Sequence, residues 1–315
     1  MQMQVPPHLK LIAIDFRAVF SHTFSARIRL SSSSTKRNEF KSLCCRKVNA
    51  PNTSHKIKLK PLALPVEHGG WGFLLEPVAL GLLVTPSWPG LFIAVAAVAG
   101  FLARHPFKIA FSDWRRGKRY PRTPLAERFM VLYAAVALAG IIAAGMSAGF
   151  YALRPLVPAL PFALIYLAYD AQKQGREWIP QLAGPLALSA AASAIALAGG
   201  WPEGKALALW TVLLARALPS IVYVRVRLRL ERGGKISALP TLLAHLAGLA
   251  VAVALVRLEL LPWLAVPALM LLLLRAAVGL SPLRRPAPAK KIGILELVYG
   301  ALAVLLVALG YWIDL

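Results

Sequence analysis

The chain has 315 residues, of which 58% are apolar, and 36 Lys and Arg against 13 Asp and Glu give it a formal net charge of +23. A soluble domain is closer to half apolar and nearly neutral, so this composition excludes an ordinary water-soluble protein. The arginines stand at the ends of apolar runs with no soluble module around them, which argues against nucleic acid as a partner. We therefore expect a multi-pass membrane protein whose partners are membrane lipids, with basic loops that contact anionic headgroups.

Residues 1–60 form a basic leader that is rich in serine and poor in acidic residues. The serine run Ser31–Ser34 lies between Arg29 and Lys36. This composition is typical of an organelle transit peptide, and the serine content favours a plastid over a mitochondrion. A disordered tail that binds anionic lipid would have the same composition. We expect a disordered leader over residues 1–60 and a multi-pass helical domain over residues 61–315.

Nine apolar windows of sufficient length to cross a bilayer follow the leader. Basic residues gather on the leader and on the loops after the second, fourth, sixth and eighth windows, which predicts that this face is stromal in a plastid or cytoplasmic at a plasma membrane. Prolines in the fourth window predict a kinked or broken helix. The sequence thus predicts an all-α membrane bundle of about nine transmembrane helices, over residues 71–86, 88–104, 128–147, 150–168, 182–199, 205–224, 239–256, 260–280 and 294–312.

The stretch Glu67-His68-Gly69-Gly70-Trp71-Gly72 marks the point where the leader meets the first window. Its glycines would let the backbone approach a ligand headgroup, and His68 is a candidate catalytic donor or base. Glu67 and Trp71 are then candidate substrate contacts. An interfacial tryptophan anchor beside a re-entrant bend would use the same residues.

Charged residues inside the apolar windows indicate a polar cluster within the bundle. Glu76 lies about two turns into the first window, and a carboxylate in hydrocarbon usually faces the bundle interior with a partner. Arg216 in the sixth window is the candidate partner, for either Glu76 or Glu296. We interpret Glu76 and Arg216 as substrate contacts or as a structural cluster. Arg275 stands close enough to its helix end to snorkel to the interface.

Two basic loops on the same face carry the remaining candidates. Arginine forks and lysine charges suit phosphate oxygens, although positive-inside bias alone explains most of these charges. Asp113 is a second candidate for moving a proton, and Asp170 is another carboxylate on this face. The predicted headgroup contacts are His105, Lys108, Arg115, Arg116 and Arg119 on the first loop and Arg225, Arg227 and Arg229 on the second.

The stretch from Leu64-Pro65 through Gly72, followed by Phe101-Leu102-Ala103-Arg104, resembles the YwiC-like family of bacterial membrane proteins. That family is known for an HGxW-type start of its first span. The resemblance covers most of the chain after the leader. It implies a polytopic membrane protein without an assigned reaction.

A more distant likeness is to the UbiA-type intramembrane prenyltransferases. Nine spans with basic loops after the second and the sixth resemble that family, and Tyr120–Leu125 is similar to the exit from its first motif. The family holds Mg²⁺ against an isoprenoid diphosphate with aspartates on these two loops. Here the first loop retains Asp113 alone, and arginines occupy the second. Because Mg²⁺ needs several oxygen ligands, we expect no metal site and no Mg²⁺ cofactor.

Three functions remain open from the sequence. A UbiA-like bundle would accept an isoprenoid or other phosphorylated lipid at its basic mouth, and as an enzyme it would be a prenyltransferase-type transferase that neutralises the leaving group with Arg or Lys. A non-catalytic membrane component or transporter would pass an anionic solute along broken helices. A structural or assembly factor is the third.

Overall fold

The computed structural model describes residues 68–313. The chain divides into residues 1–55 and 56–315, and every described residue belongs to the second unit. The leader expected over residues 1–60 lies outside the described residues. Within residues 68–313 there are nine α-helices, one short 3-10 helix and no strand, so the all-α prediction is confirmed.

Each predicted window corresponds to a helix, and the fourth is broken as its prolines predict. A 3-10 helix, η1, precedes α5, with Pro155 at the α5 N-cap. Seven helical segments are long and apolar enough to cross a membrane, whereas α2 and α9 are shorter apolar helices. The helices are α2 (His68–Val84), α3 (Trp88–Arg115), α4 (Thr123–Ala148), η1 (Phe150–Leu153), α5 (Leu156–Ala171), α6 (Trp178–Ala198), α7 (Glu203–Glu231), α8 (Leu239–Arg257), α9 (Ala265–Leu280) and α10 (Ala289–Ile313).

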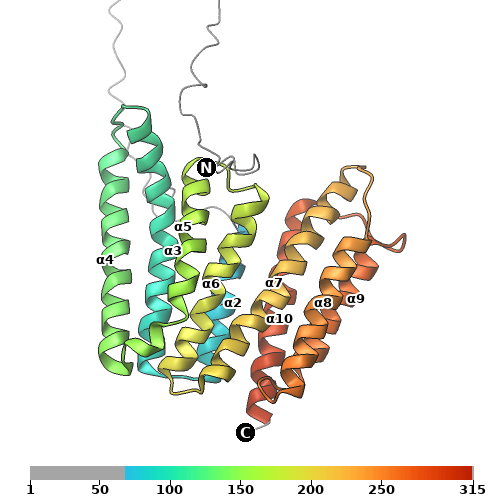
Figure 1. Cartoon of the computed structure of the whole chain (residues 1–315). Coiled ribbons are helices and arrows are strands. Elements are labelled where there is room, and N and C mark those ends of the chain that lie inside the picture. Colours follow the sequence, from blue (N-terminus) through green and yellow to red (C-terminus); the bar gives the residue numbers. More distant parts are fainter. Residues whose placement is uncertain (1–67, 314–315) are drawn as a thin grey trace, which may run out of the picture. The chain divides into compact units, whose positions relative to one another are not determined.

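Consecutive helices run in opposite directions, so the loops after α3, α5, α7 and α9 lie at one end of the helical unit (Figure 1). We call it the basic end, because these loops carry most of the charge. The first residues of α2 lie at the same end, and α10 finishes at the opposite end. The loops that are basic in the sequence are therefore those that lie together at one end of the helices.

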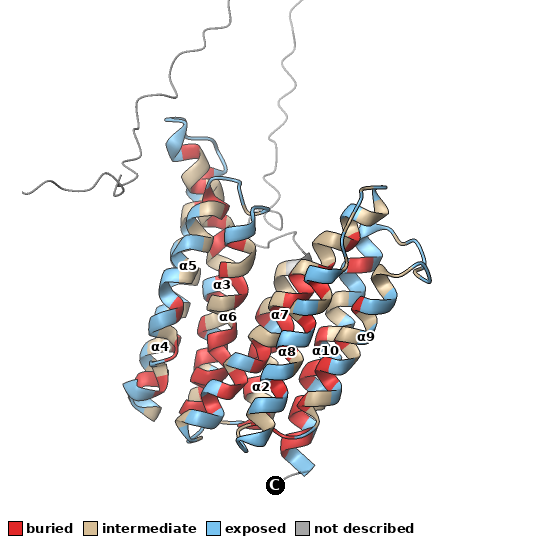
Figure 2. Ribbon diagram, turned by 45° about the vertical axis from the view of Figure 1, so that its right-hand side comes forward, coloured by how far each residue is buried: buried red, intermediate tan, exposed pale blue. Residues whose placement is uncertain are grey.

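Helix α6 forms the centre of the packing. Every residue from Ser189 to Ala198 is buried, and α2, α3, α5 and α7 all pack against α6. Its small side chains let neighbouring backbones approach closely. Gly81 of α2 would place a Cβ 2.9 Å from the Ile195 Cβ, and Gly90 of α3 would place one 3.0 Å from the Ile195 Cγ2. Figure 2 shows the buried residues along these central helices and the exposed residues on the outer faces.

The outer surface is apolar, as a lipid-facing surface must be. Helix α4 packs along α3 and exposes Val131, Leu138 and Met146. Exposed tryptophans occur near both ends of the helices, as in the aromatic belts at membrane interfaces. They are Trp114 and Trp178 at the basic end and Trp88, Trp263 and Trp312 at the other.

Candidate functional site

A cavity of about 830 Å³ lies between the helices and reaches the basic end. Helices α2, α3, α5, α6, α7 and α10 line it together with the loop between α5 and α6. We call Lys173, Arg176 and Arg225 the mouth, because they stand at the basic end. We call Glu76, Arg216 and Ser220 the floor, because they lie deeper along α2 and α7.

The mouth is cationic and partly held in place. The Arg225 Nε donates to the Gln181 Oε1 at 2.6 Å, and its Nη2 donates to the Arg176 carbonyl. The guanidinium carbon lies 4.0 Å from the centre of the Trp178 ring. Among residues 68–313, no carboxylate forms an ion pair with Lys173, Arg176 or Arg225. No ion pair within the described residues therefore neutralises the charge of the mouth.

Asp170 pairs with a different set of cations on the cavity wall. Its carboxylate accepts from the Lys108 Nζ at 2.7 Å and lies 3.7 Å from the Arg104 Nε. The Arg104 guanidinium lies over the Phe101 ring at 4.9 Å and over the Tyr166 ring at 5.2 Å, and it donates to the Tyr166 hydroxyl. These contacts join α3 to α5. Because one carboxylate faces two cations, Asp170 offsets only part of the positive charge on this part of the wall.

Two glycines of α2 form part of the cavity wall. The sequence predicted that these glycines would let the backbone approach a ligand headgroup. Gly70 and Gly72 both line the cavity. A Cβ on Gly70 would stand 3.1 Å from the Phe101 Cζ, and one on Gly72 would stand 2.7 Å from the Leu297 Cδ2. Side chains at these positions would therefore press against the opposite walls.

The other residues of that stretch have separate places. Trp71 packs edge-on against Phe101, with ring centres 5.3 Å apart, and is not among the residues that line the cavity. His68 is the first residue of α2. Glu67 and the His68 side chain lie outside what the structure describes.

The floor holds a buried ion pair. The Arg216 Nη2 lies 2.9 Å from the Glu76 Oε1, and both side chains are less than one tenth exposed. The same Nη2 donates to the Glu296 carbonyl at 3.1 Å. Both residues predicted as partners thus contact Arg216: Glu76 through its carboxylate and Glu296 through its backbone carbonyl. A Cβ on Gly300 would overlap the Glu76 carboxylate and the Arg216 guanidinium, so the pair needs a glycine in α10.

The prediction that Arg275 snorkels to the interface is wrong. Only 6% of its side chain is exposed, and its Nη1 lies 2.6 Å from the Glu296 Oε1. Its guanidinium also lies over the rings of Tyr223 and Tyr299. Because the Glu296 carboxylate of α10 lies at the same depth, Arg275 forms an ion pair inside the bundle and does not extend its guanidinium to the interface. Glu76, Arg216, Arg275 and Glu296 together form a network without net charge that joins α2, α7, α9 and α10.

The predicted contacts on the second basic loop separate from one another. Arg225 lines the mouth, whereas Arg229 is exposed. Arg227 is buried but does not line the cavity. It donates to the carbonyls of Gly279 and Arg285 and pairs with Glu231 at 2.7 Å. Arg227 therefore ties α7 to the segment between α9 and α10.

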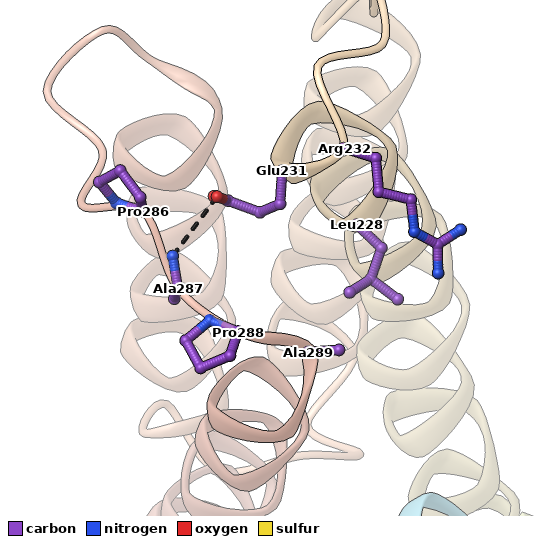
Figure 3. Close-up of a pocket in the computed structure, with 7 residues that line it drawn as sticks. All are labelled: Leu228, Glu231, Arg232, Pro286, Ala287, Pro288 and Ala289. Atoms are coloured by element: carbon purple, nitrogen blue, oxygen red, sulfur yellow. Dashed lines mark hydrogen bonds between the residues drawn. The ribbon is translucent and has the colours of Figure 1, made fainter.

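A second, smaller hollow of about 420 Å³ lies beside this tie. The hollow has Leu228, Glu231 and Arg232 on the α7 side and Pro286–Ala289 on the other (Figure 3). The Ala287 N–H donates to the Glu231 Oε2 at 3.4 Å. Glu231 also pairs with Arg227 and lies 3.8 Å from the Arg284 Nε, so its carboxylate is shared between two arginines beside this hollow.

The first basic loop joins the end of α3 to the start of α4. We call this turn the corner, and it is separate from the cavity. Asp113 is fully buried and accepts from the Arg122 Nη2 at 2.9 Å and from the Thr123 Oγ1 at 2.8 Å. The hydrogen bond that Arg122 donates to Asp113 raises the pKa of the Arg122 guanidinium above its ordinary value. Arg119 pairs with Glu127 at 3.2 Å. Asp113, His105, Arg115, Arg116 and Arg119 are all absent from the described lining of the cavity.

The carboxylates in the described part of the chain do not fit a magnesium site. No group of three or more His, Cys, Asp or Glu side chains is gathered there in a way that could hold a metal. The oxygens of Asp113 already accept from Arg122 and Thr123, and those of Asp170 face Lys108 and Arg104. Mg²⁺ requires several available oxygen ligands, so no step through Mg²⁺ follows from this site.

Apolar helices that alternate in direction, with tryptophans at both ends and most of the charge at one end, define a polytopic helical membrane protein. Residues 64–196 match the family model described as YwiC-like protein. The resemblance predicted from the Glu67–Gly72 stretch is thereby confirmed over this region. No curated protein and no solved structure gives a significant match, and the likeness to UbiA-type prenyltransferases stays a prediction. Within the matched region lie α2, α3 and α5 and nearly all of α6, whereas α7 and α10 complete the cavity from outside it.

Six polar residues that line the cavity were not among the predicted contacts: Tyr166, Lys173, Arg176, Gln181, Ser220 and Glu296. Lys173 and Arg176 stand on a short loop whose charge is modest beside the arginine-rich first loop. Gln181 is a polar residue within the first turn of an apolar helix, and this position could have indicated a role at the interface. Ser220 follows Arg216 by four residues, a spacing that places both on one helix face.

Proposed function

We propose that the protein binds a phosphorylated amphiphile, with the phosphate in the mouth and the apolar chain inside the cavity. The observation that carries this proposal is a set of cations without ion-pair partners among the described residues, next to apolar walls that include Phe73, Leu188 and Ile221. Guanidinium and ammonium groups are the usual protein donors to phosphate oxygens. Isoprenoid phosphates and phospholipids both join a phosphate to apolar chains, so both belong to the proposed ligand class.

The mouth suits an anion in two further ways. Gln181 and Trp178 hold Arg225 in one orientation, so less freedom is lost when a phosphate binds. Helices α2, α6 and α10 begin at the basic end, and each has residues near its start that line the cavity. The positive ends of their dipoles favour negative charge there.

The geometry supports ligand binding more directly than it supports a reaction. His68 stays the candidate for proton transfer, because α2 borders the cavity within its first turn. Asp113 is not retained in that role, since its carboxylate serves the corner between α3 and α4. The proposal assigns no divalent cation to the site.

Binding of decyl phosphate to the protein in lipid nanodiscs tests the proposal, with decanol as the uncharged comparison. Replacing Arg176 and Arg225 together by Gln should weaken decyl phosphate binding by about 30-fold, because charge-assisted hydrogen bonds are lost. Replacing Arg115 and Arg116 by Gln is the matched control and should leave binding unchanged. Equal binding of decanol, or an equal loss in the control, would contradict the proposal. Mass spectrometry of the lipid retained on purification then distinguishes an isoprenoid phosphate from a phospholipid.

Transport of an anionic solute is the second candidate, and the prolines favour it. Five of the six cavity helices carry a proline in their interior: Pro77, Pro106, Pro161, Pro185 and Pro219. An interior proline removes a backbone hydrogen bond and lets a helix bend. Counter-flow of labelled phosphate in liposomes would support transport. Binding of decyl phosphate without any counter-flow would exclude it.

A further inference from the structure

The floor of the cavity offers a hydrogen-bond donor that the described residues do not use. Arg216 lines the cavity and only 5% of its side chain is exposed. Its Nη2 serves Glu76 and the Glu296 carbonyl, but its Nε is buried without a hydrogen-bond partner among residues 68–313. A buried N–H without an acceptor is unfavourable and uncommon. Because Arg216 lines the cavity, a small rotation of its guanidinium would bring this N–H to a ligand oxygen at the floor.

A hydroxyl stands on the same face of α7, one turn from Arg216. Ser220 is 2% exposed and also lines the cavity. Its oxygen accepts from the Arg275 Nη2 at 3.4 Å, and its own hydrogen can rotate toward a ligand. The floor therefore offers an N–H donor and a hydroxyl side by side.

The charge of the floor indicates which kind of oxygen fits. Glu76 balances Arg216, and Glu296 balances Arg275. A charged ligand group would add an uncompensated charge to a buried site, which is strongly unfavourable. A neutral hydroxyl or carbonyl oxygen can accept from Arg216 without that cost.

The spacing along α7 relates the floor to the mouth. Nine residues separate Arg216 from Arg225 on one continuous helix. At the usual rise this is about 13 Å, the length of an extended chain of roughly ten carbons. Ile221 and Val224 lie between them and line the cavity, so the intervening space suits an alkyl chain.

We infer that the cavity has a second subsite, formed by Arg216 and Ser220 beside Glu76, that binds a neutral oxygen at the far end of the ligand's chain. The inference rests on the proposed function, because it takes the phosphate to lie in the mouth. The ligand class is then an amphiphile with a phosphate at one end and a hydroxyl or carbonyl at the other.

The test compares decyl phosphate with ω-hydroxydecyl phosphate in the same nanodiscs. The wild-type protein should prefer the hydroxylated probe by about tenfold, since hydrogen bonds to charged groups are strong in buried sites. Arg216→Lys keeps a positive charge opposite Glu76 but lacks the Nε, and should abolish the preference. Ser220→Ala is a milder change and should reduce it by about threefold. Arg227→Lys replaces a buried arginine of α7 outside the cavity and should retain it.

Each outcome decides between the two proposals. Partition of each probe into empty nanodiscs is measured separately and used to correct the wild-type preference. These lipid differences cancel when a variant is compared with the wild type. If the wild type binds both probes equally and the binding depends on Arg225, the subsite is overturned and the proposed function stands. If neither probe binds, both are overturned. A preference retained by Arg216→Lys and Ser220→Ala, or tighter binding of ω-carboxydecyl phosphate than of the hydroxylated probe, also overturns the subsite.

Discussion

Two arginine-rich regions lie at the same end of the helices and use their charge differently. At the corner between α3 and α4, Arg122 serves buried Asp113 and Arg119 pairs with Glu127, while Arg115 and Arg116 are exposed. At the mouth, Arg225 is oriented by a neutral amide and an aromatic ring. The corner uses carboxylates to fix a turn, and the mouth leaves its cations for a ligand. Density of arginine therefore does not distinguish the two regions, whereas position does: Arg225 lines the cavity, and the arginines of the corner do not.

Charge reversal should separate the two regions by the largest margin. Arg225→Glu removes the oriented cation and places a like charge beside a bound phosphate, so decyl phosphate binding should fall by about 100-fold. Arg116→Glu is the matched change at the corner and should alter binding by less than about twofold. Isothermal titration in nanodiscs measures both. Comparable losses in the two variants would remove the distinction drawn between the regions.

Removal of the corner's carboxylate should affect stability alone. Asp113→Ala leaves the Thr123 hydroxyl without its acceptor and Arg122 without its partner, which should lower the free energy of unfolding by about 2 kcal/mol. Titration with a denaturing detergent measures this change. Decyl phosphate binding should remain at the wild-type level, and a parallel loss of binding would place Asp113 in the site.

The smallest expected effect is a gain in binding. Asp170→Asn removes the carboxylate that balances Lys108 and Arg104, which increases the positive charge beside the cavity. Decyl phosphate should then bind about threefold more tightly. Glu127→Gln is the matched control, because it frees Arg119 at the corner, away from the cavity. Weaker binding by Asp170→Asn would instead show that the carboxylate itself contacts the ligand or shapes the site.

The number and direction of the helices followed from the sequence, because apolar length and the alternation of charge both report on the bilayer. The helix ends did not follow. Helix α3 continues to Arg115 although its apolar window ends at residue 104, since charged side chains outside the hydrocarbon do not stop a helix and Pro106 is accommodated within it.

The site was predictable only in part. A carboxylate in hydrocarbon must find a partner, so a cluster around Arg216 could be anticipated, but the choice between Glu76 and Glu296 as its partner could not. The choice of mouth residues could not, because it depends on which helices are neighbours in space. Arg115 and Arg225 both belong to arginine-rich stretches near the basic end, and the structure places the first in solvent and the second beside Gln181.

The ion pair at the floor also has a consequence for how the protein is made. Helix α2 is short and carries Glu76 near its middle, while its guanidinium partner belongs to α7 and the adjoining carbonyl to α10. Among the described helices α2 comes first in the chain, and its carboxylate is compensated by residues about 140 and 220 positions later. Helix α2 therefore reaches its final environment only when α7 and α10 are in place.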